Sequence, residues 1–186
     1  LTPFDDLYIH DSMLPTGNLR EPRAGAKRAD IIVVTKCPDG VAYSKLQEIQ
    51  YALGLQSHQK LYFSKISYDS QIFGISETLP LHYLADKRFT LVTGIANPKP
   101  LVEFLLRKEF DFSHEKFPDH HTFTDTEIKR LQQKELIITT EKDFMRLQPK
   151  LKKFALYYLP IKTHILNDQE QFFKELIQRR IREAMH

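Results

Sequence analysis

Short apolar runs alternate with amphipathic stretches along most of this 186-residue chain. The run Ile31-Ile32-Val33-Val34 is fully apolar and β-branched, which is typical of a strand buried on both faces of a parallel sheet. Further runs have the length and composition of strands. They span 61–68, 89–93, 136–140 and 154–160, and a short strand is expected at 109–112.

Between these runs the spacing of apolar residues changes to the helical period. The first predicted helix covers 41–53 and ends at Gly54, where a left-handed cap belongs. The second covers 98–108, with Asn97 as its N-cap and Pro98 at its first position. Further helices are expected over 125–133, directly after Thr140, and after an N-cap at Asn167 or Asp168. The last of these is expected to bury five apolar residues, namely Phe172, Phe173, Leu176, Ile177 and Ile181.

The alternation of strands and helices indicates parallel strands joined by right-handed crossovers. We therefore predict an α/β fold, a mostly parallel, Rossmann-like sheet with helices on both faces. Residues 1–30 are interpreted as a connecting segment with a short basic helix, and residues 31–186 as one α/β domain. The stretch 64–88 has the weakest pattern and is interpreted as an irregular insertion.

Polar residues follow several of the predicted strands, at the end of the sheet where ligands of such folds lie. Four junctions carry them: Thr35-Lys36, Gly94-Ile95-Ala96-Asn97, Asp119-His120 and Thr140-Glu141-Lys142-Asp143. We expect these junctions to converge on one edge of a single sheet.

The composition is that of an ordinary globular protein, with 41% hydrophobic and 27% charged residues. A net charge of +3 is too small to indicate nucleic-acid binding, and it fits an anionic small ligand or a membrane surface. Cys37 is the single cysteine, so no disulfide within the chain and no multi-cysteine zinc site can form, which favours the cytoplasm. No apolar run reaches the roughly 20 residues of a spanning helix, so we expect a soluble or peripheral protein. The chain begins with Leu1 and is interpreted as a fragment.

The densest candidate chemistry is the step Asp119-His120-His121, within 117–123. Thr124 and Glu127 follow with the spacing of a capping box, so a helix starts directly after this step. A histidine can move or orient a proton near neutral pH, and Asp119 can fix a tautomer. Three interpretations stay open from the residues alone: polar caps without chemistry, acid-base or phosphate contact, and a metal site. The metal site would need further ligands, such as His114.

Cationic residues lie at other predicted strand and helix ends. Lys36 and Lys142 follow buried strands, where an ammonium group can reach a phosphate or simply extend into solvent. Arg20, Arg23 and Lys27 would share one face of the short basic helix, which is either a phosphate contact or a solvated surface. The chain has no Gly-x-x-x-x-Gly-Lys-Ser/Thr phosphate loop, so any kinase chemistry must be completed by residues outside it.

Five short motifs resemble, in order, the C-terminal half of tetraacyldisaccharide 4'-kinase, the lipid A 4'-kinase family. They are Leu14-Pro15-Thr16-Gly17-Asn18-Leu19-Arg20-Glu21-Pro22, Arg28-Ala29-Asp30-Ile31-Ile32-Val33-Val34-Thr35-Lys36, Gly94-Ile95-Ala96-Asn97-Pro98, Phe117-Pro118-Asp119-His120-His121-Thr122-Phe123 and Thr139-Thr140-Glu141-Lys142-Asp143. Thr16 stands where the family pattern has a small Ala. The resemblance spans Leu14 to about Asp143.

This resemblance implies a P-loop kinase that moves the ATP γ-phosphate to the 4'-hydroxyl of a tetraacyl glucosamine disaccharide 1-phosphate, giving lipid IVA in lipid A biosynthesis. It implies ATP and Mg as cofactors of the full-length protein. The phosphate loop, the magnesium-holding acids and an acidic base would belong to an N-terminal P-loop domain outside this chain. The resemblance also implies roles for particular residues. Asp119 and His120 would be catalytic, with His120 pairing to the absent base, and the nucleotide contacts would be Thr35, Lys36, Glu141, Lys142 and Asp143. Independently of the resemblance, we predict that Arg20 and His121 contact the substrate and that no residue holds a metal.

The family resemblance also implies a location and a state for the fragment. The full-length protein would act as a peripheral protein at the cytoplasmic face of the bacterial inner membrane, without a nucleic-acid partner. The isolated fragment is expected to be inactive and to bind no cofactor. Two alternatives remain, a metal-dependent phosphoesterase using Asp119, His120 and His121, and a non-catalytic module that binds a nucleotide or a partner.

Overall fold

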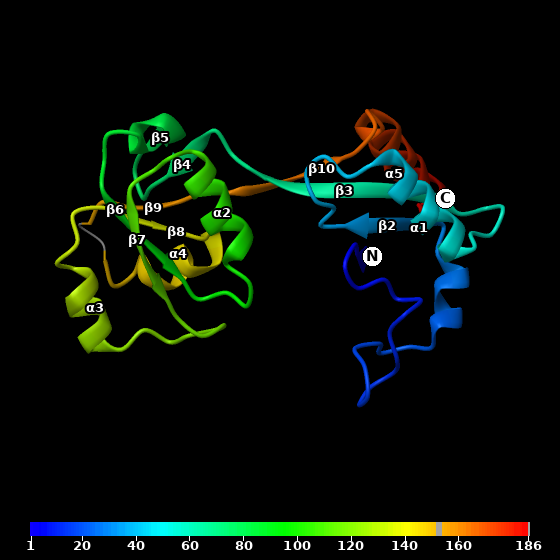
Figure 1. Ribbon diagram of the computed structural model, residues 1–186, viewed down its shortest axis with the longest axis horizontal. Coiled ribbons are helices and arrows are strands. Elements are labelled where there is room, and N and C mark those ends of the chain that lie inside the picture. The colour runs from blue at the N-terminus through cyan, green and yellow to red at the C-terminus, as the bar shows by residue number, and fades with distance from the viewer. Residues whose placement is uncertain (152–153, 186) are drawn as a thin grey trace. The chain divides into compact units, whose positions relative to one another are not determined.

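The computed structural model describes residues 1–151 and 154–185, and the chain forms two compact units (Figure 1). Unit 1 consists of Leu1–Ser67 together with the C-terminal residues from Lys162 onward, and unit 2 consists of Tyr68–Ile161. Each unit has its own sheet and its own buried apolar clusters. The predicted division, with a boundary after residue 30 and one domain over 31–186, therefore differs from the division that the structure shows.

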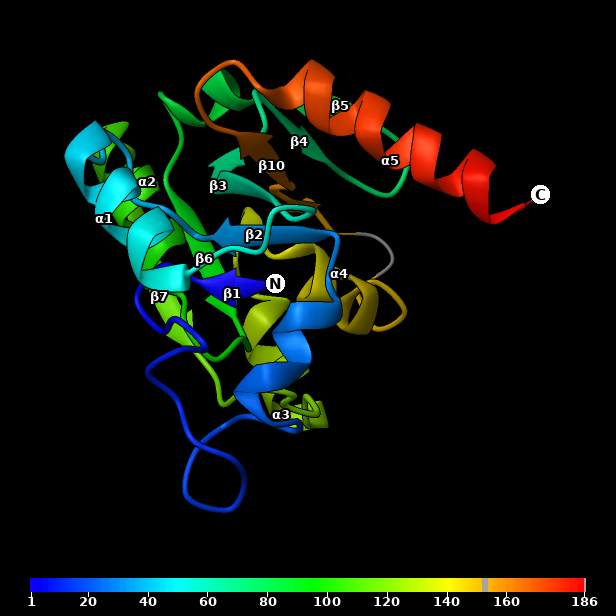
Figure 2. The same ribbon diagram turned by 90° about the vertical axis from the view of Figure 1, so that its right-hand side faces the viewer.

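Unit 1 is built on a four-stranded sheet with the order β1-β2-β3-β10. The strands are β1 (Thr2–Pro3), β2 (Ile31–Thr35), β3 (Lys60–Tyr68) and β10 (Ile161–Ile165), and β1, β2 and β3 are parallel. The helical elements are the 3-10 helix η1 (Arg23–Arg28), α1 (Tyr43–Leu53) and the long α5 (Glu170–Ala184), which Figure 2 shows at the C-terminal end of the chain.

Alternate residues of β2 connect the unit 1 sheet to different helices. Ile32 and Val34 are buried in a cluster with Leu46 and Ile49 of α1. Val33, on the other face, is buried with Leu176 of α5. Because successive side chains of a strand point to opposite faces, this places one helix on each face of the sheet.

Unit 2 is built on a six-stranded sheet with the order β5-β4-β9-β8-β6-β7. Its elements are β4 (Gln71–Phe73), β5 (Thr78–Pro80), the 3-10 helix η2 (Leu81–Leu84), β6 (Phe89–Thr93), α2 (Lys99–Arg107), β7 (Phe112–Lys116), α3 (Asp125–Leu131), β8 (Ile137–Thr139), α4 (Glu141–Leu147) and β9 (Leu156–Tyr158). Strands β6 to β9 are parallel, and β4 is antiparallel to both of its neighbours, β5 and β9.

Both faces of the unit 2 sheet are covered by helices. Leu91 of β6 is buried with Leu101 and Leu105 of α2. Its neighbour Val92 points to the opposite face and is buried with residues of α3 and α4, such as Leu131 and Leu147. The predicted α/β class, mostly parallel with helices on both faces, is confirmed.

Several predicted element ends match the structure. Helix α1 ends at Gly54, which has a φ of 56°, in the left-handed region where glycine is unstrained. The capping box of α3 is present, with both the Thr124 and the Glu127 bond. Strand β6 has the predicted bounds, 89–93.

Other element bounds differ from the predictions. The strand expected at 109–112 is β7, which begins only at Phe112, because the chain turns at Glu109 with a φ of 59° and Phe112 then stacks on Phe89 at 5.4 Å. The stretch 64–88 is regular in part, with the end of β3, the hairpin β4–β5 and η2. Strands β1 and β10 had not been predicted.

Helix α5 corrects two predictions. Its N-cap is Gln169, whereas Asn167 and Asp168 precede it with positive φ. Its apolar face is only partly covered. Leu176 is buried and Phe173 is half-buried against Tyr62, whereas Phe172, Ile177 and Ile181 are 67%, 36% and 54% exposed. Across the described residues, none of the helices has the length and apolar character that a membrane span requires.

Two neighbouring leucines of α2 test the assignment of the core. Leu105 is fully buried against the unit 2 sheet, whereas Leu106 is 58% exposed. We predict that Leu105→Ala lowers the free energy of unfolding by about 2–5 kcal/mol, because it removes a buried side chain and leaves a cavity. Leu106→Ala, the matched control, should change it by less than about 1 kcal/mol. Urea unfolding followed by circular dichroism measures both, and equal losses would contradict the placement of α2.

Candidate charged site at the end of the unit 2 sheet

Three connections meet at the carboxyl ends of adjacent parallel strands in unit 2. They follow β6, β7 and β8, which lie in the order β8-β6-β7. The Phe117 N–H, directly after β7, donates to the Thr93 carbonyl at the end of β6 at 2.7 Å. The Gly94 N–H, directly after β6, donates to the Asp143 carboxylate in α4 at 2.7 Å. The polar residues of these three connections therefore lie at one edge of the sheet, where α/β proteins bind ligands.

Asp143 joins two of these connections from a fully buried position. Its Oδ2 atom accepts the Gly94 N–H and also the Thr140 hydroxyl, at 2.8 Å. A Cβ atom on residue 94 would lie only 2.9 Å from Asp143 Oδ1, so the close approach requires a glycine there. Asp143 therefore fixes the start of α4 against the end of β6, and a direct contact of this carboxylate with a nucleotide stays a prediction.

His120 extends from the loop between β7 and α3. Its φ is 59°, a left-handed conformation uncommon for residues other than glycine, and its side chain is 72% exposed. Nε2 of the imidazole lies 3.3 Å from Lys142 Nζ, and Nδ1 lies 3.2 Å from an Arg146 guanidinium nitrogen. Lys142 and Arg146 are four residues apart on α4, so they share one helix face. The imidazole thus lies between two cations.

The two cations cannot both donate to His120 when the ring is neutral. A neutral imidazole has one N–H and one acceptor nitrogen, whereas charged Lys and Arg side chains only donate. Only one of the two cations therefore donates to a neutral His120, and the other lies beside the ring without a hydrogen bond to it. We name His120, Asp119, Lys142 and Arg146 the charged site.

Asp119 and Asp143 balance the charge of these cations. Lys142 Nζ donates to Asp119 Oδ1 at 2.8 Å, and this bond, together with the nearby His120, lowers the pKa of Asp119 below its usual value. Arg146 lies at the longer distance of 3.5 Å from Asp143 Oδ1. Since that contact is long, the Arg146 guanidinium has the greater capacity to bind an added anion.

His121 points to a different set of partners. Its Nε2 lies 2.9 Å from Glu127 Oε2, and its ring stacks on Phe117 at 4.9 Å and meets the edge of Phe123 at 5.2 Å. The backbone N–H of Thr124 and the His121 bond lower the pKa of Glu127 to about 2. The predicted substrate contact of His121 stays a prediction, since its ring is only 20% exposed.

The remaining predicted site residues have different surroundings. Glu141 is exposed in the first turn of α4. Thr35, Lys36 and Arg20 belong to unit 1, where the Thr35 hydroxyl donates to the Thr2 carbonyl at 3.4 Å and Lys36 is exposed with a φ of 59°. The prediction that all four junctions lie on one sheet edge was wrong for Thr35-Lys36, because β2 pairs with β1 and β3.

Arg146 is the site residue that sequence reasoning missed. The signal was present, since Arg146 follows Lys142 by four residues in a predicted helix and so had to share its face. What the pattern did not show was that this face meets the loop carrying His120.

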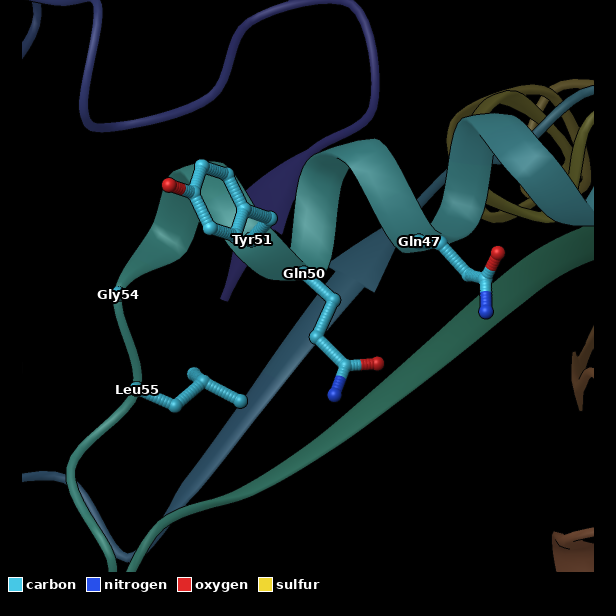
Figure 3. A pocket seen from close by; sticks show the side chains of 5 residues that line it. All are labelled: Gln47, Gln50, Tyr51, Gly54 and Leu55. Atoms are coloured by element: carbon cyan, nitrogen blue, oxygen red, sulfur yellow. The ribbon is translucent and has the colours of Figure 1, made fainter.

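Neither a metal site nor the pocket beside α1 adds to this candidate site in the described residues. No three His, Cys, Asp or Glu side chains gather in a metal-binding arrangement within 1–151 and 154–185. A pocket of about 510 Å³ at the end of α1 is lined by Gln47, Gln50, Tyr51, Gly54 and Leu55 (Figure 3). It contains no residue of the charged site and no group suited to acid-base chemistry near neutral pH.

Known proteins resemble this chain over almost its whole length. The family model described as tetraacyldisaccharide-1-P 4'-kinase matches residues 4–182. The chain belongs to this kinase family. The tetraacyldisaccharide 4'-kinase of Flavobacterium johnsoniae is 44% identical to it over 96% of the chain, and that of Bacteroides thetaiotaomicron is 35% identical over 98%.

The chain spans about half the length of the curated tetraacyldisaccharide 4'-kinases that it matches, 53% and 54% for these two relatives. A crystal structure of LpxK from Aquifex aeolicus, described as an "apo" form in complex with ATP, is similar with a TM-score of 0.60. The similarity covers 91% of this chain and 48% of that one, at 23% identity. It shows a shared fold.

The bonds of Glu127 predict a dependence of stability on pH. The pKa of Glu127 in the folded chain, about 2, lies below its ordinary value of 4.5. The ionised carboxylate therefore stabilises the fold above pH 4.5, and this contribution is lost as the pH falls towards 2. We predict that the difference in unfolding free energy between wild type and Glu127→Gln is constant above this window and shrinks within it. Urea unfolding at a series of pH values measures this, and a difference that does not change with pH would contradict it.

Proposed function

We propose that this chain is the C-terminal half of a tetraacyldisaccharide 4'-kinase. The full-length protein would transfer the ATP γ-phosphate to the 4'-hydroxyl of a tetraacyl glucosamine disaccharide 1-phosphate and so produce lipid IVA. The observation that carries the proposal is the family match over residues 4–182, which includes every residue of the charged site. The exposed position of His120 between two cations supports it chemically.

Asp119 and His120 would act on the acceptor side of the reaction. Phosphoryl transfer depends mainly on positioning and on neutralising charge. The His120 ring is exposed, and only one of its nitrogens can accept from the two cations, so the other can orient the acceptor hydroxyl or pair with an acidic base supplied by the N-terminal half. Asp119, kept ionised by Lys142, can accept a hydrogen bond from the same hydroxyl.

Lys142 and Arg146 would contact the phosphates of ATP. Both offer charged donors at the exposed edge of the sheet, which suits a polyanion. Asp143 would act indirectly, by holding Arg146 and the Gly94 turn, and Glu141 would lie beside them on α4. Thr35 and Lys36 stay predicted nucleotide contacts from unit 1.

The two carboxylates beside Lys142 and Arg146 do not suit magnesium. Oδ1 of Asp119 is bonded to Lys142, and the Asp143 carboxylate is fully buried, with Oδ2 bonded to the Gly94 N–H and the Thr140 hydroxyl. We therefore assign the magnesium ligands, like the phosphate loop, to the N-terminal half. The same reasoning leads us to propose that this chain alone is inactive and binds no cofactor tightly.

Arg20 would contact the lipid substrate from unit 1. Its exposed side chain lines a pocket of about 280 Å³ together with Glu21 and Arg23. A cation beside such a pocket suits an anionic disaccharide phosphate. The substrate is a lipid, so the full-length protein would act peripherally at the cytoplasmic face of the inner membrane.

Replacement of His120 tests the catalytic assignment. In the full-length protein, His120→Ala should lower kcat by about 100-fold or more, because an orienting or proton-transferring group is removed. Its side chain is exposed, so the melting temperature should hardly change. Lys129→Ala, on the exposed surface of α3, is the control that should leave both unchanged. If His120→Ala lowered both kcat and the melting temperature, the role of His120 would be to stabilise the loop and not to take part in catalysis.

Replacement of Arg146 tests the phosphate contact that we add. Arg146→Met keeps the aliphatic stem but removes every donor, so KM for ATP should rise about tenfold or more. Arg88→Met is the matched control, since Arg88 is exposed and lies 3.9 Å from Asp111, outside the charged site. Steady-state kinetics on the full-length protein measure both. If KM and kcat of Arg146→Met were unchanged, Arg146 would not contact the phosphates of ATP.

A further inference from the structure

His120 and His121 are neighbours in sequence but differ in exposure and in partners. The side chain of His120 is 72% exposed, and that of His121 is 20% exposed. The left-handed φ of His120 turns the chain so that one ring faces α4 and the other faces the start of α3. An unusual backbone conformation of this kind persists only when the surrounding contacts determine it.

The His120 N–H donates to Asp119 Oδ1 at 2.9 Å, and the next residue, His121, bonds to Glu127 in α3. The His121 ring packs between Phe117 and Phe123, which lie at the two ends of the loop, and its Nε2 bonds to Glu127. The ionised Glu127 can only accept, so Nε2 of His121 carries the hydrogen. We name His121, Glu127 and the two phenylalanines the His121 clamp.

The clamp is more than a helix cap. A capping box needs only the two reciprocal bonds between Thr124 and Glu127, and both are present. The bond from His121 is additional to these two. It connects the loop before α3 to the Glu127 carboxylate in the first turn of α3. Glu127 Oε2 thus receives three donors, from the Thr124 N–H at 2.7 Å, the Thr124 hydroxyl at 2.9 Å and His121 at 2.9 Å.

The β7–α3 loop is also fixed at Phe117, where it leaves β7. Only the residues between Phe117 and His121 extend towards α4. The Phe117 N–H is bonded to the end of β6. Between Phe117 and His121 the chain has room only for a tight turn, with the His121 N–H donating to the Pro118 carbonyl at 3.2 Å. Asp119 and His120 form the tip of this turn, and both contact Lys142.

We propose that His121 is a positioning residue, whose bond to Glu127 fixes the turn that presents His120 to Lys142 and Arg146. This inference rests on the proposed function for its kinetic consequence, although the geometry can be tested without it. It assigns to His121 a role different from the substrate contact predicted from sequence.

Two variants of His121 separate the bond from the packing. His121→Phe keeps an aromatic ring between Phe117 and Phe123 but cannot donate to Glu127. His121→Gln loses the ring stacking but keeps an N–H donor. If the bond fixes the turn, His121→Phe should be the more harmful substitution and His121→Gln should restore part of the loss.

The first measurement uses this chain alone. Nuclear Overhauser contacts between the His120 ring and the Arg146 side chain should be present in wild type, weakened or lost in His121→Phe, and partly restored in His121→Gln. The spectrum of each variant also shows whether unit 2 is folded. Contacts that persist unchanged in a folded His121→Phe would overturn the proposal.

The second measurement uses the full-length protein. His121→Phe should lower kcat by about 10- to 100-fold, since a misplaced catalytic group is costly, while KM for ATP stays within about twofold of wild type. A lower kcat caused only by unfolding would be visible as a lower melting temperature and would not be restored by His121→Gln, and that result would overturn the positioning role. Lost ring contacts in His121→Phe, combined with a wild-type protein that has no kinase activity, would refute the proposed function and still support the clamp.

Discussion

The charged site depends on one buried group, the Asp143 carboxylate. It accepts the Gly94 N–H after β6 and the Thr140 hydroxyl at the start of α4, and it lies beside Arg146. A buried carboxylate is costly unless its oxygen atoms are bonded, so these partners cannot move independently of it. The position of α4, and with it the face that carries Lys142 and Arg146, follows from this arrangement.

At His120 the β7–α3 loop meets the charged face of α4. Helix α4 supplies the cations Lys142 and Arg146, and the bonds of Asp143 hold this helix in place. From the β7–α3 loop comes the imidazole, on a turn that Phe117 and His121 fix at its ends. The cations are balanced by Asp119 and Asp143, so the site has no large excess of positive charge. Such a site is suited to the proposed role as one side of a phosphoryl-transfer centre, which an N-terminal half would complete with a phosphate loop and metal ligands.

The sequence predicted the local features well, because caps and buried strands are determined by neighbouring residues. Gly54 and the Thr124–Glu127 capping box are examples. It could not predict which strands pair, because that depends on contacts between distant segments, and Thr35-Lys36 was therefore placed on the sheet of β6 and β8. The convergence of the Asp119-His120 and Thr140-Glu141-Lys142-Asp143 junctions on one edge was expected. The contacts of Lys142 and Arg146 with His120, and the outward and inward directions of the two histidines, depend on tertiary packing and on the φ of His120.

The central claim is that this chain supplies the acceptor side of a kinase site that only the full-length protein completes. A product assay with ATP, magnesium and a tetraacyldisaccharide 1-phosphate tests it most directly, with mass spectrometry to count and locate the added phosphate. The account predicts one phosphoryl group on the 4'-oxygen with the full-length protein and none with this chain alone. Turnover by this chain alone, or no transfer by the folded full-length protein, would contradict it.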